Sequence, residues 1–220
     1  TISPMCAVSR MLKAKEPDAV TVFIGPCISK KSEVKDHAIE GNADYALTYS
    51  EIRAIMHARN VELEEDDNSY QESSIYGKRF ANSGGVTEAV LRRLSPDHSK
   101  EAMHEIAECG VRGEEGIKEF TVPYKGMDIN VCVASGLANA RIVMERVKNG
   151  EANYHLIEVM ACRRGCIMGG GQPVRAGDRT KAARAKGLYN ADNTMLIKKS
   201  DENPMVLELY QGLLKGKEHK

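Results

Sequence analysis

The sequence has no net charge and no long apolar run. Its 31 Lys and Arg residues balance its 31 Asp and Glu residues, so the formal net charge at pH 7 is zero. A chain without excess positive charge is not expected to hold nucleic acid or an anionic membrane through a broad electrostatic surface. No uninterrupted apolar stretch reaches the length that crosses a bilayer. We therefore predict no nucleic-acid partner and no membrane partner.

A secretory signal, an internal repeat and a low-complexity segment are missing as well. The first fifteen residues hold three basic side chains and no cleavable apolar core. Six cysteines are present, but a 220-residue chain with 42% hydrophobic residues is too large and core-rich to need a disulfide framework. We therefore predict a reducing compartment, the cytoplasm, in which some of the cysteines bind metal.

The strongest positive signal is a cysteine pair followed by glycines. Cys162 and Cys166 are separated by three residues, and the glycine run 169–171 comes soon after them. Residues 154–160, which precede the pair, are apolar enough to be a buried strand. Glycine has no Cβ, so the run lets the backbone approach whatever the thiolates bind. Thiolates are the usual ligands of iron–sulfur clusters and of zinc, although a pair of buried cysteines before a loop shows the same spacing.

A second strand-like segment, Val20 to Ile24, also ends near a cysteine. Cys27 follows it, and Lys30 and Lys31 come within four residues of that cysteine. Cationic neighbours favour the thiolate form of a cysteine, which is the form that binds metal. Taken alone, the same pattern is also that of an ordinary loop cysteine.

Together the two segments resemble motifs of the iron-only, or [FeFe], hydrogenases. The first motif, at 26–33, reads Pro-Cys-Ile-Ser-Lys-Lys-Ser-Glu. The second, at 158–173, reads Glu-Val-Met-Ala-Cys-Arg-Arg-Gly-Cys-Ile-Met-Gly-Gly-Gly-Gln-Pro. Shorter matches lie at 82–86, 111–113, 135–140 and 198–210. With them, the resemblance spans nearly the whole chain.

The resemblance implies a catalytic H-cluster, in which a [4Fe–4S] cubane is linked to a diiron site that carries CO, cyanide and a dithiolate. Cys27 and Cys162 would be ligands of the cubane, and Cys166 would be the ligand that also bridges to the diiron unit. At the catalytic site, Lys30 would hydrogen-bond a cyanide as a charge-assisted pair, and Met160 would pack against the diiron unit. A surface lysine and a core methionine are the ordinary alternatives. For Glu33, an ordinary ion pair and a role at the site both stay open.

The sequence departs from the family at three places. The family's first motif, Thr-Ser-Cys-Cys-Pro, supplies one cubane ligand and a proton-shuttling cysteine, and it is absent from residues 1–220. We therefore interpret the chain as the C-terminal part of the H-cluster domain and expect the motif on an upstream segment or another subunit. Gly25 stands where catalytic members usually carry methionine, and we expect it to leave a space beside the cofactor. Arg163 and Arg164 replace small or neutral residues between the last two cysteines.

The order of strands and helices predicts an α/β architecture. Long helical connections between the strands favour parallel pairing. Cys27 and Cys162 both follow predicted strands at their C-terminal ends, where ligands bind in such sheets. The resemblance implies the two-lobed iron-only hydrogenase fold, with mostly parallel sheets flanked by helices and a cofactor cleft between the lobes.

Local signals set several element boundaries. Ser3 is predicted to cap a first helix, and Ser50 is predicted to cap another. The glycine pair 84–85 precedes a helix whose free N–H groups can bind an anion, although a simple tight turn fits equally well. Residues 62–74 are predicted to be a solvated loop. Strands are predicted over 119–124 and 128–134, and further helices over 138–148, 180–189 and 201–214.

Three functions fit these features. The first is a catalytic or sensory [FeFe] hydrogenase domain, with a redox partner such as ferredoxin or an NAD(P)-linked subunit. The second is an iron–sulfur carrier or assembly protein without a diiron site, and the third is a zinc-bound structural domain, which the glycine run does not explain. Lys30 and Met160 favour the hydrogenase. Because the first cysteine motif is absent, we expect the 220-residue fragment alone to be inactive.

Overall fold

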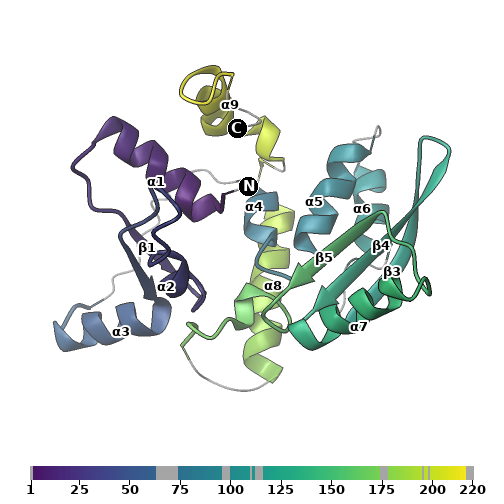
Figure 1. Ribbon diagram of the computed structural model, residues 1–220, viewed down its shortest axis with the longest axis horizontal. Helices are drawn as coiled ribbons and strands as arrows, with labels where there is room; N and C mark the ends of the chain where they lie inside the picture. The colour runs from purple at the N-terminus through teal and green to yellow at the C-terminus, as the bar shows by residue number, and fades with distance from the viewer. Residues whose placement is uncertain are drawn as a thin grey trace. The chain divides into compact units, whose positions relative to one another are not determined.

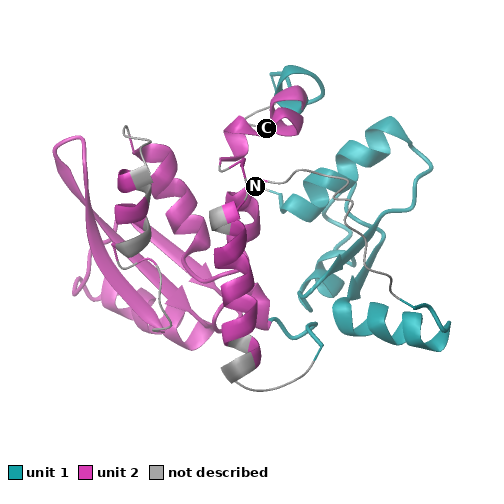
Figure 2. Cartoon of the chain, turned by 180° about the vertical axis from the view of Figure 1, so that it is seen from behind, with its two compact units in different colours: residues 1–69, 169–177, 209–220 teal, residues 70–168, 178–208 magenta. Residues whose placement is uncertain are grey.

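The computed structural model describes residues 2–62, 74–95, 100–109, 111, 116–173, 178–194, 196–197 and 199–216. The chain divides into two compact units (Figure 2). Unit 1 contains residues 1–69, 169–177 and 209–220, and unit 2 contains residues 70–168 and 178–208. This division agrees with the expected two-lobed fold. Most of the predicted loop 62–74 and part of the matching segment 111–113 lie outside the described residues.

Unit 1 is built on a two-stranded parallel sheet, β1-β2. In the register of this sheet, Val22 lies opposite Tyr45 and Gly25 lies opposite Thr48. The elements of unit 1, labelled in Figure 1, are α1 (Pro4–Lys15), β1 (Val22–Gly25), the short α2 (Lys30–Glu33), β2 (Tyr45–Thr48) and α3 (Tyr49–Ala58).

The two longer helices of unit 1, α1 and α3, begin at capping residues. As predicted, the side chain of Ser3 caps α1. The prediction that Ser50 caps α3 is wrong, because Thr48 does so. The Thr48 hydroxyl accepts the N–H of Glu51 at 3.3 Å, and Glu51 Oε2 accepts the N–H of Thr48 at 2.8 Å. This reciprocal box needs Glu or Gln three residues after the cap, which Thr48 has, whereas Ser50 is followed at that distance by Arg53.

Asp44 joins α1 to the segment that leads into β1. Its carboxylate accepts hydrogen bonds from Lys13 Nζ at 2.8 Å and from the Thr21 N–H at 2.7 Å. The bond from Lys13 and then the bond from the Thr21 backbone lower the pKa of Asp44 to about 2. A carboxylate with a depressed pKa stabilises the fold above its unfolded-state pKa, near 3.9, and loses that effect as the pH falls towards 2.

Replacing Asp44 with asparagine should therefore lower the free energy of unfolding at pH 7 by about 0.5 kcal/mol, a small value because the pair is partly exposed to solvent. The difference from the parent protein should shrink as the pH falls from about 4 towards 2. Urea unfolding across that range measures it, with the exposed Asp18→Asn as the control. A loss that does not change with pH would contradict the assignment.

Unit 2 is built on a three-stranded mixed sheet in the order β3-β4-β5. β3 and β4 form the predicted antiparallel hairpin, and β4 pairs in parallel with β5. Two of the three strand pairings in the described chain are thus parallel, as expected. The bounds are α4 (Ile75–Arg79), α5 (Gly85–Leu94), α6 (Lys100–Glu108), β3 (Ile117–Tyr124), β4 (Met127–Ser135), α7 (Leu137–Lys148), β5 (Leu156–Met160), the 3-10 turn η1 (Cys166–Met168) and α8 (Asp178–Thr194).

Both faces of this sheet are covered. Figure 1 shows α7 on one face and α5 and α6 on the other. Cys132 and Ala134 of β4 pack with Ala140 and Val143 of α7. Val131 and Val133, at alternate positions of β4, point to the opposite face and are also at 0% exposure. The sheet is therefore a rigid base for the cysteine loop that follows β5.

The C-terminal helix is shorter than predicted. Instead of beginning at Asp201, α9 (Pro204–Gln211) follows a separate 3-10 turn, η2 (Ser200–Glu202). Proline lacks an N–H and fixes φ, so Pro204 is suited to the first helical position and marks the start of α9. None of the helices in the described parts of the chain has the length and apolarity needed to cross a membrane.

Candidate functional site

In unit 1, Cys27 lies in the loop between β1 and α2. Its side chain is half-buried and is not in a disulfide. The glycine run of the second motif is hydrogen-bonded to this loop: the Gly171 N–H donates to the Pro26 carbonyl at 2.9 Å, and the Ser50 N–H donates to the Gly171 carbonyl at 3.1 Å. The segment that follows Cys166 by a few residues is thus fixed beside the Cys27 loop.

Close packing explains why this segment consists of glycines. A Cβ on Gly171 would lie 2.6 Å from Thr48 Cγ2 and 3.0 Å from the Pro26 carbonyl oxygen. A Cβ on Gly170 would lie 2.3 Å from Ile28 Cδ1. The glycine run was predicted to let the backbone approach a neighbouring group closely. In the structure that neighbour is the Cys27 loop of the protein itself.

Lys30 begins α2, three residues after Cys27, and forms an ion pair with Glu33. Lys30 Nζ lies 2.5 Å from Glu33 Oε2, and the Ser3 hydroxyl donates to the other carboxylate oxygen. Burial raises the pKa of Glu33, but the hydrogen bonds from Lys30 and Ser3 outweigh it and hold the pKa below its ordinary value. The ion pair expected as one alternative for Glu33 is seen. A role of Glu33 at the site, and the contact of Lys30 with a cyanide, stay predictions.

The space expected beside Gly25 is filled. Gly25 is buried, and a Cβ there would lie 2.5 Å from Cζ of Phe23. Residues two apart on a strand share a face, so the Phe23 ring can fold over the glycine. The expectation of an empty space is wrong because a neighbouring side chain occupies it.

In unit 2, Cys162 and Cys166 bracket a tight loop after β5. The Gly165 N–H donates to the Cys162 carbonyl at 3.0 Å, and Arg164 and Gly165 have positive φ angles of 72° and 88°. The Arg164 N–H donates to Ser135 Oγ, at the end of β4, at 2.6 Å. Both cysteines are half-buried and outside disulfides, so the loop presents two thiols from one tight turn.

The loop that precedes α5 supports this turn from the other side. The Ile167 N–H donates to the Ala81 carbonyl at 3.2 Å. A Cβ on Gly165 would lie 2.4 Å from that carbonyl oxygen and 2.9 Å from Ser83 N. Both the backbone angle and the packing therefore require glycine at position 165.

Alanine at position 165 should destabilise the protein by about 3 kcal/mol, because it combines a positive φ with a backbone clash. Gly126→Ala is the matched control, since Gly126 also has a positive φ, 79°, but a Cβ there would meet no heavy atom of the described residues within 4 Å. It should cost only the conformational strain, about 1 kcal/mol. Chemical unfolding measures both variants, and equal losses would show that the contact with Ala81 is not tight.

Met160 is half-buried at the end of β5, where its carbonyl accepts the Gly136 N–H at 2.7 Å. It is not a fully buried core residue, and its packing against a diiron unit stays a prediction. Arg163, which follows Cys162, is exposed.

The N-terminus of α5 binds a carboxylate of the protein itself, that of Glu158. Glu158 Oε1 accepts the Gly84 N–H at 2.7 Å, and Glu158 Oε2 accepts the Thr87 N–H at 2.7 Å. Sequence reasoning placed Glu158 in the second motif but gave it no role. The signal that could have found it was a carboxylate within an otherwise apolar strand, which needs a buried partner.

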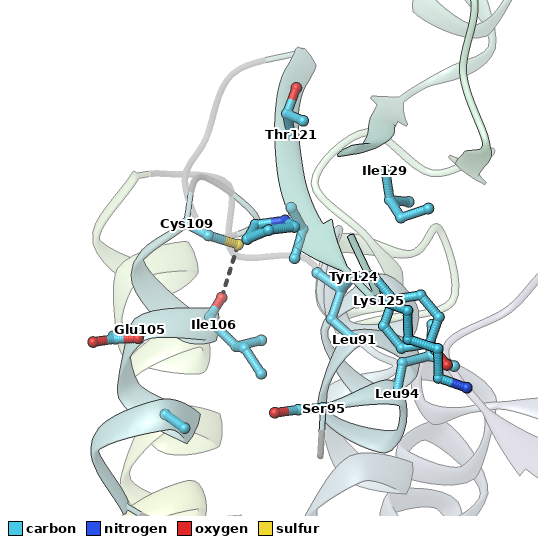
Figure 3. A pocket seen from close by; sticks show the side chains of 13 residues that line it. Leu91, Leu94, Ser95, Glu105, Ile106, Cys109, Thr121, Tyr124, Lys125 and Ile129 are labelled. Carbon is cyan, nitrogen blue, oxygen red and sulfur yellow. Dashed lines mark hydrogen bonds between the residues drawn. The ribbon is translucent and has the colours of Figure 1, made fainter. Parts of the chain in front are cut away.

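The other three cysteines take part in packing. Cys6 and Cys132 are fully buried, at 0% exposure. Cys109 lies at the wall of a cavity of about 510 Å³ between α5, α6 and the β3–β4 hairpin, where its thiol donates to the Ile106 carbonyl at 3.0 Å (Figure 3). Burial raises the pKa of both Cys109 and Cys132, which disfavours the thiolate that binds metal.

The donor set fits an iron–sulfur cluster. Thiolates are the usual ligands of such clusters, and Cys27, Cys162 and Cys166 are half-buried thiols outside disulfides. In the loop that supports Gly165, Asn82 Nδ2 and Ser83 Oγ are buried polar atoms with no hydrogen-bond partner among the described residues. Such groups are suited to donate to cluster sulfur.

Neither unit alone provides the complete set of thiols. Cys27 belongs to unit 1, whereas Cys162 and Cys166 belong to unit 2. Among the residues that the structure describes, no three His, Cys, Asp or Glu side chains are grouped closely enough to hold a metal ion. The convergence of the three cysteines on one site therefore stays a prediction.

Comparisons with known proteins agree with the motifs. Residues 1–170 match the family model described as iron only hydrogenase large subunit, C-terminal domain. Residues 178–220 match the model described as iron hydrogenase small subunit. The two matches together cover most of the chain.

Individual relatives include hydrogenases and an assembly protein. The NADP-reducing hydrogenase subunit HndD of Solidesulfovibrio fructosivorans is 34% identical, over 89% of this chain and 35% of the relative. The cytosolic iron-sulfur assembly component 3 of Mus musculus is 27% identical, over 92% of this chain and 45% of the relative. The chain thus spans less than half the length of either protein.

Among solved structures, the apo [FeFe]-hydrogenase HydA1 from Chlamydomonas reinhardtii superposes with a TM-score of 0.68 and 29% sequence identity. The superposition covers 97% of this chain and 65% of that one. Fold, motifs and family match agree, and the chain belongs to the family of iron-only hydrogenase large subunits, as their C-terminal domain.

Proposed function

We propose that this chain is the C-terminal part of the H-cluster domain of an [FeFe] hydrogenase, an oxidoreductase that interconverts protons, electrons and H₂ or senses H₂. One observation carries the proposal: the glycine run that follows Cys162 and Cys166 is hydrogen-bonded to the loop that holds Cys27, through Gly171 and Pro26 at 2.9 Å. The end of the second motif and the Cys27 loop of the first motif therefore lie side by side within unit 1, which supports a cofactor shared by the two motifs.

In this proposal Cys27, Cys162 and Cys166 would hold a [4Fe–4S] cubane, and Cys166 would also be the ligand shared with a diiron unit that carries CO, cyanide and a dithiolate. When bound, this cofactor supplies the metal chemistry of proton reduction. Lys30 would direct its ammonium group to a cyanide and share it with Glu33, whose carboxylate lies 2.5 Å from the ammonium. Met160 would pack against the diiron unit and limit the access of water.

The remaining parts of the enzyme lie outside these 220 residues. The fourth cubane ligand and the proton-shuttling cysteine belong to an upstream segment or another subunit, which accords with the greater length of the hydrogenase relatives. A redox partner such as ferredoxin or an NAD(P)-linked subunit delivers the electrons. We place the protein in the cytoplasm, a reducing compartment in which cysteines stay available as metal ligands.

The second candidate is an iron–sulfur assembly protein, and the likeness to cytosolic iron-sulfur assembly component 3 favours it. Infrared spectroscopy of the full-length protein after maturation separates the two functions, because bound CO and cyanide absorb where proteins do not. We expect CO and cyanide bands that disappear when Cys166 is replaced. Bound iron without these bands would favour the assembly protein, and a protein that binds zinc but no cluster would contradict both.

A further inference from the structure

We propose that Glu158 is a positioning residue, whose carboxylate binds the N-terminus of α5 and thereby fixes the loop that carries Cys162 and Cys166. The importance of that loop for a cofactor rests on the function proposed above. The mechanical role of Glu158 rests on hydrogen bonds within unit 2.

Glu158 serves as the cap that α5 lacks. The N-cap position of α5 is Gly84, which has no side chain to accept a hydrogen bond. Gly84 cannot be exchanged for a capping residue, because its φ is 92° and a Cβ would lie 2.3 Å from the Val111 carbonyl oxygen. The N–H groups of Gly84 and Thr87 are bound instead by the two oxygens of Glu158, each at 2.7 Å. Because Glu158 is only 7% exposed, water does not replace it easily.

The residues just before Gly84 contact the cysteine loop. The Ala81 carbonyl accepts the Ile167 N–H at 3.2 Å, and the backbone at Ala81 and Ser83 is so close to Gly165 that no Cβ fits between them. The segment 81–84 therefore contacts the cysteine loop on one side and the Glu158 carboxylate on the other. If the carboxylate is removed, this segment loses its attachment to β5.

The cysteine loop is also attached to the sheet. The Arg164 N–H donates to Ser135 Oγ at 2.6 Å, and the Gly136 N–H donates to the Met160 carbonyl at 2.7 Å. Glu158 lies on β5 opposite Val133, two residues before the Ser135–Met160 pair. The cysteine loop is thus hydrogen-bonded both to the sheet and to the segment that precedes α5. Glu158, which lies on the sheet, binds the N-terminus of α5 and so connects these two attachments.

A second buried carboxylate provides a matched control. Glu88 lies on α5, the helix whose N-terminus Glu158 binds. It is 2% exposed and forms ion pairs with Arg79 at 2.5 Å and with Arg92 at 2.7 Å. Glu88→Gln removes a buried carboxylate that contacts α5, as Glu158→Gln does. The ion-pair partners of Glu88 are arginines of α4 and α5, however, whereas Glu158 binds the helix N-terminus beside the cysteine loop. A purely structural effect of losing a buried carboxylate should appear in both variants.

The experiment compares hydrogen–deuterium exchange of the metal-free 220-residue chain with that of Glu158→Gln and Glu88→Gln. We expect Glu158→Gln to speed exchange of the amides in 162–168 at least tenfold, a change of about 1.4 kcal/mol in local opening, and to increase alkylation of Cys162 and Cys166 relative to Cys27. Glu88→Gln should leave that segment within about twofold of the parent rate, a difference below 0.5 kcal/mol.

Equal acceleration of 162–168 in the two variants, or no acceleration in either, would overturn the proposal. If circular dichroism shows that Glu158→Gln does not fold, Glu158→Asp is measured in its place, because it keeps the charge but is one methylene shorter. We expect Glu158→Asp to give exchange rates for 162–168 between those of the parent and those expected for Glu158→Gln. Exchange at the parent rate would overturn the proposal. Iron content after reconstitution of the full-length parent is measured separately. A parent that binds no iron would sink the proposed function and leave the exchange result valid.

Discussion

Serine in place of Cys162 or Cys166 should remove at least about nine-tenths of the cluster iron from the reconstituted full-length protein. A serine hydroxyl is a far poorer ligand for iron than a thiolate. Changes in residues that only support a metal ligand already cost about 10–100-fold in affinity, so loss of the ligand itself should cost at least as much. Cys27→Ser should have the same effect if, as we propose, the three cysteines share one cofactor. Iron and sulfide analysis after anaerobic reconstitution measures each variant.

Cys109→Ser is the matched control for these substitutions. Cys109 is half-buried like the three proposed ligands and lies in unit 2, but its thiol is bonded to the Ile106 carbonyl in a separate cavity. We expect it to keep the iron content of the parent. Full iron in Cys27→Ser with loss in Cys162→Ser would mean that the motifs do not converge, and the two-lobed cofactor site would have to be abandoned.

The 220-residue chain alone should evolve hydrogen at least about 100-fold more slowly than the full-length protein. General acid–base groups typically contribute about 100-fold to 10,000-fold to a rate, and the proton-shuttling cysteine is absent here together with the fourth cubane ligand. The measurement is gas chromatography of H₂ produced with a reduced dye after maturation of both proteins. The expectation depends on chemistry implied by the family's first motif.

Adding the upstream segment, with or without its shuttle cysteine, distinguishes the effect of the missing fourth cubane ligand from that of the missing proton-shuttling cysteine. A segment that carries both cysteines of the Thr-Ser-Cys-Cys-Pro motif should restore cluster iron and turnover. The same segment with serine at the shuttle position should restore iron but leave turnover at least about 100-fold low. Rapid hydrogen evolution by the isolated 220-residue chain would show that it contains its own fourth ligand and proton path, contrary to this account.

Local signals in the sequence predicted much of the fold. Ser3 caps α1 as expected, and the hairpin forms at Lys125 and Gly126, where positive φ angles of 48° and 79° suit a tight turn. The strand before Cys162 forms as predicted from its apolar character, but it is not a fully buried strand, because only Glu158 of its residues is buried and Val159 is exposed. These features depend on residues that are close in sequence, so a single sequence contains the information.

The failures depend on contacts that spacing does not encode. Glu158 binds Gly84 across 74 positions of sequence. The local signals indicate an anion site at the glycine pair and a partner for the buried carboxylate, but they do not indicate that the two belong together. Phe23 covers Gly25 through a choice of side-chain rotamer, which strand periodicity alone does not determine. The error at Ser50 was of another kind, since Thr48 and Glu51 form a recognisable capping box that the sequence already contained.

The division of the chain also has a consequence for the order of folding during synthesis. Unit 1 begins with the first residues but includes 169–177, and its Pro26–Gly171 hydrogen bond joins segments 145 positions apart in the numbering. The sheet of unit 2 lies wholly within 117–160 and needs no such distant partner. Since domains form as their segments leave the ribosome, the later unit can acquire its sheet before the earlier one closes. The loop of Cys162 and Cys166 leaves the ribosome before the glycine run, and the Cys27 loop can gain its Gly171 partner only after both motifs have been synthesised.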